Sequence, residues 1–258
     1  MIRAIFLDVD GTLISFSTHE IPASALRALA QAHERGVRLF IATGRAANDL
    51  GPLEGIPYDG VVSLNGARCV ANDGRVVSLH PIPRADFERA LALSEEQGFA
   101  MGLELEEGVF VNRVTPDVER VAHMVAHPVP EQTDLRELFG RVECCQLCFY
   151  FDAQTQRRVM AELPTLAASR WCPIFADVNV AGIDKATGME EFMRSYGFSA
   201  AEVAAFGDGG NDVAMLRAAG AGVAMGNACD EALAAADYVT ASVDDDGIRR
   251  ALEHFGVI

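Results

Sequence analysis

The chain has 258 residues, half of them hydrophobic, and its 21 lysine and arginine residues against 37 aspartate and glutamate residues give a formal net charge of −16. This composition excludes intrinsic disorder and is typical of a globular protein, since the apolar surface suffices for a core. The acidic excess argues against nucleic acid and anionic membranes as main partners, because both require a basic surface, but it leaves small anionic ligands open.

The N-terminal third alternates short apolar runs with a helical pattern. Residues Ile2–Leu7 predict a buried parallel strand, and Pro22–Arg35 predict a helix that ends at Gly36. The apolar runs Val37–Ala42 and Val61–Leu64 predict two further strands. This order of strands and helices is typical of a doubly wound parallel sheet, so we predict a Rossmann-like α/β core.

The middle of the chain follows a different pattern. Runs such as Met101–Glu106 and Val142–Phe151 alternate with a period of two, which is typical of a sheet with one solvated face. We therefore predict that residues 82–182 form an inserted α+β domain, a cap on a core made of residues 1–81 and 183–258.

The core pattern returns after this insertion. Residues Val203–Phe206 predict a strand that runs into the glycine-rich loop Gly207–Asp212. The remaining elements are predicted in the order helix to Ala219, strand Gly222–Met225, helix Asp230–Ala235, strand Tyr238–Thr240 and a helix after Gly247.

The sequence contains no evident signal sequence and no apolar run long enough to cross a membrane. Its cysteines also indicate the compartment in which the protein acts. Three of the six cysteines lie within Cys144–Cys148, a spacing unlike that of a secreted disulfide framework. We expect reduced thiols, a cytoplasmic protein with no membrane partner, and a monomer or a small homo-oligomer.

Polar residues follow several of the predicted core strands. The carboxyl ends of parallel strands lie at one edge of a sheet, where ligands bind, so residues far apart in sequence are expected to meet there. Asp8 and Asp10 lie two residues apart at the end of the first strand, so their side chains are expected on the same side of the chain. They suit a nucleophile with a proton shuttle, or a cation site, or merely an acidic turn at Gly11.

Three more clusters accompany this pair. Thr43 and Gly44 follow the second strand and suit either a phosphate site or an ordinary helix cap. Lys185 begins a predicted helix, against the dipole preference, which indicates either a nearby anion or a solvated surface lysine. The loop Gly207–Asp212 offers oxygen ligands for Mg²⁺, or is only a helix entry with Asn211 or Asp212 as its cap.

Together these clusters resemble the haloacid dehalogenase superfamily of phosphohydrolases. The resemblance is carried by Asp8-Val9-Asp10-Gly11-Thr12, Thr43-Gly44-Arg45, Lys185 and Gly207–Asp212, in that order. The runs Asn65–Ala67, Gly222–Ala228 and Ala236–Thr240 are similar to the Cof-type branch of sugar-phosphate phosphatases, in which a cap domain is inserted between the second and third motifs.

The resemblance implies a role for each matched residue. Asp8 is implied as the nucleophile that forms an aspartyl-phosphate, and Asp10 as the acid and base. The phosphate-binding groups implied are Thr43, Lys185, Asn211 and the backbone amides near Val9 and Gly44. The Mg²⁺ ligands implied are Asp8, the main-chain carbonyl of Asp10 and Asp208, with Asp212 supporting the ion indirectly or through water.

The sequence thus predicts a Mg²⁺-dependent phosphatase acting on a small phosphorylated metabolite, with sugar phosphates as the expected class. One alternative is a phosphomutase of the same superfamily, which would return the phosphate to a second hydroxyl. Another is a sugar-phosphate-binding protein without catalysis.

Overall fold

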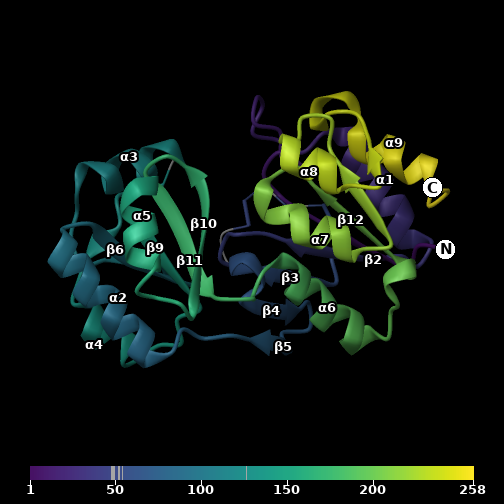
Figure 1. The fold of residues 1–258 in the computed structure, drawn as a ribbon. Helices are drawn as coiled ribbons and strands as arrows, with labels where there is room; N and C mark the ends of the chain where they lie inside the picture. The colour runs from purple at the N-terminus through teal and green to yellow at the C-terminus, as the bar shows by residue number, and fades with distance from the viewer. Residues whose placement is uncertain (48–49, 52, 54, 126) are drawn as a thin grey trace. The chain divides into compact units, whose positions relative to one another are not determined.

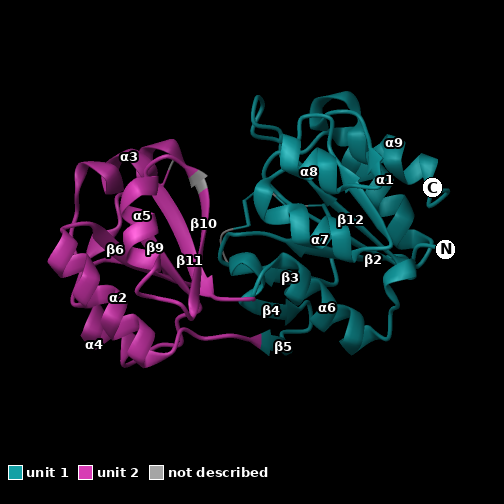
Figure 2. Ribbon diagram, viewed as in Figure 1, with its two compact units in different colours: residues 1–78, 183–258 teal, residues 79–182 magenta. Residues whose placement is uncertain are grey.

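The computed structural model describes the whole chain except residues 48, 49, 52, 54 and 126 (Figure 1). The chain divides into two compact units (Figure 2). Unit 1 contains Met1–Ser78 and Ile183–Ile258, and unit 2 contains Leu79–Gly182. Within the described residues, we find no helix with the length and apolar character needed to cross a membrane.

One sheet forms the centre of unit 1. Its strands are β1 (Ala4–Leu7), β2 (Arg38–Ala42), β3 (Gly60–Ser63), β4 (Arg68–Ala71), β5 (Val76–Leu79), β12 (Val203–Gly207), β13 (Ala221–Ala224) and β14 (Tyr238–Val239). They lie in the order β14-β13-β12-β1-β2-β3-β4-β5, and the pairs from β14 to β3 are parallel. The predicted doubly wound α/β core is confirmed, with an antiparallel β3–β4 pair added toward one edge.

Helices cover both faces of this sheet. They are α1 (Ala23–Glu34), α6 (Lys185–Tyr196), α7 (Val213–Ala218), α8 (Asp230–Ala235) and α9 (Gly247–His254), with short 3₁₀ turns at Leu64–Gly66, Ala200–Glu202, Gly210–Asp212 and Val243–Asp245. Alternate residues of β1 enter different cores. Ile5 and Leu7 pack with α1 and α9, whereas Ala4 and Phe6 pack with α6, α7 and α8. Because the strands are apolar on both faces, their sequences lack alternation.

The strand order reverses at the centre of the sheet. From β1 the chain runs outward through β2 and β3, and from β12 it runs outward the other way through β13 and β14. The neighbouring strands β1 and β12 therefore flank the switch point, the place where open α/β sheets bind ligands beyond the carboxyl ends of their strands.

Unit 2 has its own sheet and its own cores. Its strands are β6 (Ala100–Leu105), β7 (Gly108–Val111), β8 (Glu131–Gln132), β9 (Gln146–Tyr150), β10 (Leu166–Cys172) and β11 (Phe175–Val180), in the order β10-β11-β9-β6-β7-β8. The helices are α2 (Arg84–Gln97), α3 (Pro116–Met124), α4 (Leu135–Phe139) and α5 (Ala153–Met160). The pairs between β10 and β7 are antiparallel, and β7 and β8 pair in parallel.

The two faces of the unit 2 sheet are packed differently. Helices α2, α4 and α5 pack on the face that presents Leu103, Leu147 and Phe149. On the other face, α3 packs against Cys148 and Tyr150. The period of two is therefore present, but the prediction of one solvated face is wrong beneath α3, because α3 has an apolar side of its own to bury.

Candidate active site

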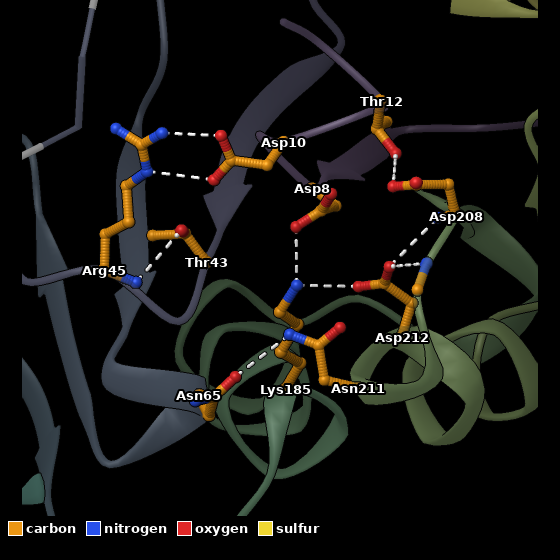
Figure 3. Close-up of polar contacts among 11 residues, drawn as sticks. Asp8, Asp10, Thr12, Thr43, Arg45, Asn65, Lys185, Asp208, Asn211 and Asp212 are labelled. Atoms are coloured by element: carbon orange, nitrogen blue, oxygen red, sulfur yellow. Dashed lines mark hydrogen bonds and ion pairs between the residues drawn. The ribbon is translucent and has the colours of Figure 1, made fainter. Parts of the chain in front are cut away.

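Two aspartates leave the sheet at the switch point. Asp8 directly follows β1, and its N–H donates to the Phe206 carbonyl in β12 at 3.0 Å. Asp208 directly follows β12. The parallel pairing of Leu7 with Phe206 holds these two strand ends level, so both aspartates reach the same edge of the sheet (Figure 3).

Lys185 lies between two carboxylates. Its Nζ donates to Asp8 Oδ1 at 2.6 Å and to Asp212 Oδ1 at 2.7 Å (Figure 3). It is the first residue of α6, whose N-terminus is capped by the Asp184 side chain. Lys185 is fully buried, so the reading of a solvated surface lysine is wrong. Burial lowers the pKa of Lys185, but the charges of Asp212 and Asp8 outweigh that effect and raise it above its usual value.

Asp212 folds the glycine-rich loop back on itself. Its Oδ2 accepts from the N–H groups of Asp208 and Gly209 at 3.0 and 2.9 Å, while its other oxygen binds Lys185. Gly207 makes room for it, since a Cβ at Gly207 would lie 2.4 Å from the Cβ of Asp212. Asp212 does precede α7, but its carboxylate bonds to the loop rather than capping that helix.

The buried charges at this edge do not balance. Oxygens of Asp8, Asp208 and Asp212 lie within 4.8 Å of one another, and Lys185 supplies a single positive charge among them. Burial and the charge of Asp212 raise the pKa of Asp8 well above its usual value despite Lys185. Burial, with the charge of Asp212 next, raises the pKa of Asp208 to about 6.

These residues fit a hard divalent cation. Ionised, the three carboxylates and Lys185 sum to a charge of −2, and carboxylate oxygens are the ligands that Mg²⁺ prefers. The site is also shaped around Asp208. The Thr12 hydroxyl donates to its Oδ1 at 3.1 Å, and a Cβ at Gly11 would lie 2.3 Å from its Oδ2.

Asp10 pairs with a different cation from the one that Asp8 and Asp212 share. The chain turns after β1, since the N–H groups of Leu13 and Ile14 both donate to the Val9 carbonyl, at 2.9 and 2.8 Å. The extended backbone of β1 therefore ends before Asp10, and the same-side placement of Asp8 and Asp10 stays a prediction. Asp10 forms a two-point ion pair with Arg45 (Figure 3). Arg45 belongs to the Thr43-Gly44-Arg45 motif, and the resemblance implied no role for it.

Thr43 and Asn211 are linked through Asn65. Thr43 follows β2 and is buried, and its carbonyl accepts from the Asn65 N–H at 3.0 Å. The Asn65 side chain accepts from Asn211 Nδ2 at 3.1 Å. A Cβ at Gly44 would lie 3.2 Å from the Asn65 side chain. Asn65 is thus a residue of this site, although its sequence pattern indicated only the resemblance to the Cof-type branch. Its φ of +53° marks it, because a non-glycine residue seldom adopts that value.

Metal-free protein should show the raised pKa of Asp208 as a pH-dependent stability. The folded-state pKa of about 6 exceeds the ordinary 3.8, so the folded state binds more protons between these values. This contribution to stability is fully present below about pH 4 and is lost as the pH rises through about 6. In urea unfolding with EDTA, the stability of wild type relative to Asp208→Asn should therefore fall over this range. A difference that stays constant or rises would contradict it.

Comparisons with known proteins show the family of this chain. A family model for haloacid dehalogenase-like hydrolases matches residues 5–252. BT1666 of Bacteroides thetaiotaomicron, a solved phosphatase of the haloalkanoate (HAD) enzyme superfamily, is 54% identical with a TM-score of 0.97, covering 100% of this chain and 96% of that one. The HAD subclass IIB sugar phosphatase BT4131 is 37% identical with a TM-score of 0.90, covering 99% and 100%.

A curated relative extends the comparison to a named substrate. The 5-amino-6-(5-phospho-D-ribitylamino)uracil phosphatase YcsE of Bacillus subtilis is 29% identical over 262 residues, which cover 98% of this chain and 96% of that protein. The family match spans nearly the whole chain and includes every residue of the site described above. The chain therefore belongs to the haloacid dehalogenase-like hydrolases, and within that family it is a phosphatase.

Proposed function

We propose that the protein is a Mg²⁺-dependent phosphatase that hydrolyses small phosphorylated metabolites through an aspartyl-phosphate at Asp8. The observation that carries this proposal is the hydrogen-bonded group of Asp8, Lys185 and Asp212 beside Asp208 at the switch point. A nucleophilic carboxylate, a buried cation and a cluster of oxygen ligands are the parts that phosphoryl transfer requires, since the protein mainly positions groups and stabilises charge.

Sugar phosphates are the proposed substrate class. BT4131, at 37% identity, is named as a sugar phosphatase. YcsE acts on a compound whose phosphate is carried by a ribityl chain. Both names indicate a phosphate ester on a polyhydroxylated carbon chain. The relatives differ in what they act on, so a panel of phosphate esters is needed to identify the individual ester.

In the first step, Asp8 attacks phosphorus. One carboxylate oxygen of Asp8 forms a bond to phosphorus while the bond to the ester oxygen breaks, and that oxygen keeps the electron pair. Asp10 gives its proton to the departing oxygen, so the alcohol leaves neutral. Lys185, Thr43 and Asn211, with the backbone amides near Val9 and Gly44, hold the phosphoryl oxygens. The products of this step are the free alcohol and the aspartyl-phosphate.

In the second step, water releases the phosphate. Asp10, now a carboxylate, takes a proton from the water whose oxygen attacks phosphorus. The bond between phosphorus and Asp8 breaks, and Asp8 recovers its carboxylate. The residues therefore end in the state in which they began, and the net reaction is hydrolysis of the ester.

Three oxygen ligands are proposed for the Mg²⁺ ion. Asp8, Asp208 and the main-chain carbonyl of Asp10 would hold it directly. Asp212 would support it indirectly, because its two oxygens already accept from Lys185 and from the loop amides. When bound, Mg²⁺ would neutralise the repulsion between the nucleophilic carboxylate and the anionic phosphate.

We expect phosphate release that depends on Mg²⁺. The test incubates the protein with sugar phosphates, nucleotides and small phosphate esters, either with Mg²⁺ or with EDTA. EDTA should abolish release, and saturating Mg²⁺ should restore it. Mg²⁺ at about 100 times its dissociation constant should also raise the free energy of unfolding by about 2.7 kcal/mol. Equal release in Mg²⁺ and EDTA would contradict the metal requirement.

The same reaction mixtures separate the two alternatives. A phosphomutase would convert a hexose 1-phosphate into the 6-phosphate without releasing phosphate. A binding protein would bind a sugar phosphate in Mg²⁺ without turnover. Either outcome would replace the phosphatase proposal.

Two further predictions accompany this function. We propose that residues 82–182, which lie within unit 2, form a domain that selects the leaving group. We also propose that the protein acts in the cytoplasm, without nucleic acid or membrane as a partner and as a monomer or small homo-oligomer. Three of its six cysteines lie within Cys144–Cys148, a spacing unlike that of a secreted disulfide framework, which supports the cytoplasmic location.

A further inference from the structure

Asp10 is held by a pair of hydrogen bonds from one side chain. Arg45 Nε donates to Asp10 Oδ2 at 2.9 Å, and Arg45 Nη2 donates to Asp10 Oδ1 at 2.5 Å. Each oxygen of the carboxyl group accepts one hydrogen bond from Arg45, so the guanidinium sets the plane and direction of the group while a second lone pair on each oxygen remains for proton transfer. A two-point pair of this kind adds geometric specificity to the charge interaction.

Arg45 is itself fixed by the loop after β2. Its N–H donates to Thr43 Oγ1 at 3.1 Å, and its carbonyl accepts from the Leu64 N–H at 3.0 Å. Close to the guanidinium lies Gly51, where a Cβ would stand 3.1 Å from Arg45 Nη1. The same loop therefore places Thr43 and, through Arg45, the carboxyl group of Asp10.

We propose that Arg45 is the positioning residue for Asp10 in proton transfer. This proposal rests on the proposed role of Asp10 as acid and base. Asp10 must deliver a proton to the departing ester oxygen and later take one from water, and both transfers require its carboxyl group within hydrogen-bond reach of phosphorus-bound oxygens. A carboxyl group left free to rotate would seldom meet that geometry.

The proposal predicts a dependence on the leaving group. An alkyl or sugar phosphate releases a basic alkoxide, which needs a proton from Asp10. The p-nitrophenolate of p-nitrophenyl phosphate departs without one. We compare single-turnover rates of alcohol release, because the later hydrolysis of the aspartyl-phosphate also uses Asp10 and is common to both esters. In Arg45→Ala we expect this rate to fall about 10²-fold for a sugar phosphate, with less than about fivefold change for p-nitrophenyl phosphate. Arg45→Lys keeps the positive charge but cannot form the two-point hydrogen-bonded pair, so it should recover only part of the lost rate for the sugar phosphate.

Two controls separate positioning from general damage. Arg38→Ala removes a different Arg–Asp pair, between Arg38 of β2 and Asp59, in which Arg38 Nη1 lies 2.5 Å from Asp59 Oδ1. This change should lower the rates for both esters equally and slightly. Asp10→Asn should show the same leaving-group pattern as Arg45→Ala, but more strongly. Adding Arg45→Ala to Asp10→Asn should slow the sugar phosphate no further. Urea unfolding of each variant verifies that it is folded.

The outcomes distinguish this inference from the function on which it rests. If Asp10→Asn slows single-turnover alcohol release from both esters equally, the acid role of Asp10 fails and the inference fails with it. If Asp10→Asn shows the leaving-group pattern in single-turnover alcohol release while Arg45→Ala slows this release equally for both esters or leaves it unchanged, the acid role stands and the positioning role is overturned. Additive losses in the double variant would overturn it as well.

Discussion

Replacing Asp8 with asparagine is expected to lower kcat by about 10⁴-fold or more while the protein stays folded. The loss should be this large because the amide cannot form the covalent intermediate, and removal of a nucleophile costs at least this much in comparable enzymes. The fold should survive, because the amide oxygen can still accept from Lys185 and the buried carboxylate is disfavoured by burial and by Asp212. Steady-state phosphate release and urea unfolding measure the two effects.

Asp10→Asn provides the matched comparison. Its metal contact is proposed through the main chain, so it should retain Mg²⁺-dependent stabilisation and lose rate. Trapping of phosphorylated protein during turnover should succeed for wild type and fail for Asp8→Asn. Wild-type rates in Asp8→Asn, or phosphorylation of that variant at another residue, would show that Asp8 is not the nucleophile.

Replacing Lys185 with methionine is expected to destabilise the metal-free protein by about 3–5 kcal/mol and to abolish turnover. Methionine keeps much of the volume but removes the charge, which leaves the carboxylates of Asp8 and Asp212 buried without their shared cation. Breaking a buried ion pair by removing one partner has a cost of this order, since the remaining charge is uncompensated. Urea unfolding in EDTA at neutral pH measures the change.

Two further variants test the cause of this loss. Lys185→Met combined with Asp212→Asn should be more stable than Lys185→Met alone, because the double variant no longer buries the uncompensated charge of Asp212. Arg249 also bridges two carboxylates, Asp246 and Glu253, each at 2.9 Å, but this group is half-exposed. Arg249→Met should therefore change the stability little. Equal losses in Lys185→Met and Arg249→Met would contradict the role of burial.

Much of the fold could be predicted from local patterns. The ends of strands β1, β2, β12 and β13 lie within one or two residues of the ends of the apolar runs that predicted them. A short apolar run bounded by polar residues is typical of a buried strand. Since Asp8, Thr43 and Asp208 follow such strands, their meeting at one edge of the sheet follows from the parallel order.

The sequence by itself determined which elements form and which polar residues stand at their ends, because hydrophobic periodicity and chain breaks are local properties. Only the tertiary structure decided how those polar groups pair. Lys185 lies 177 residues from Asp8, and its burial depends on how α6 packs on the sheet. Asp10 likewise pairs with Arg45, which lies 35 residues further along the chain. Charge pairing depends on distance in space and on exclusion of water, and both arise only when separate elements pack together.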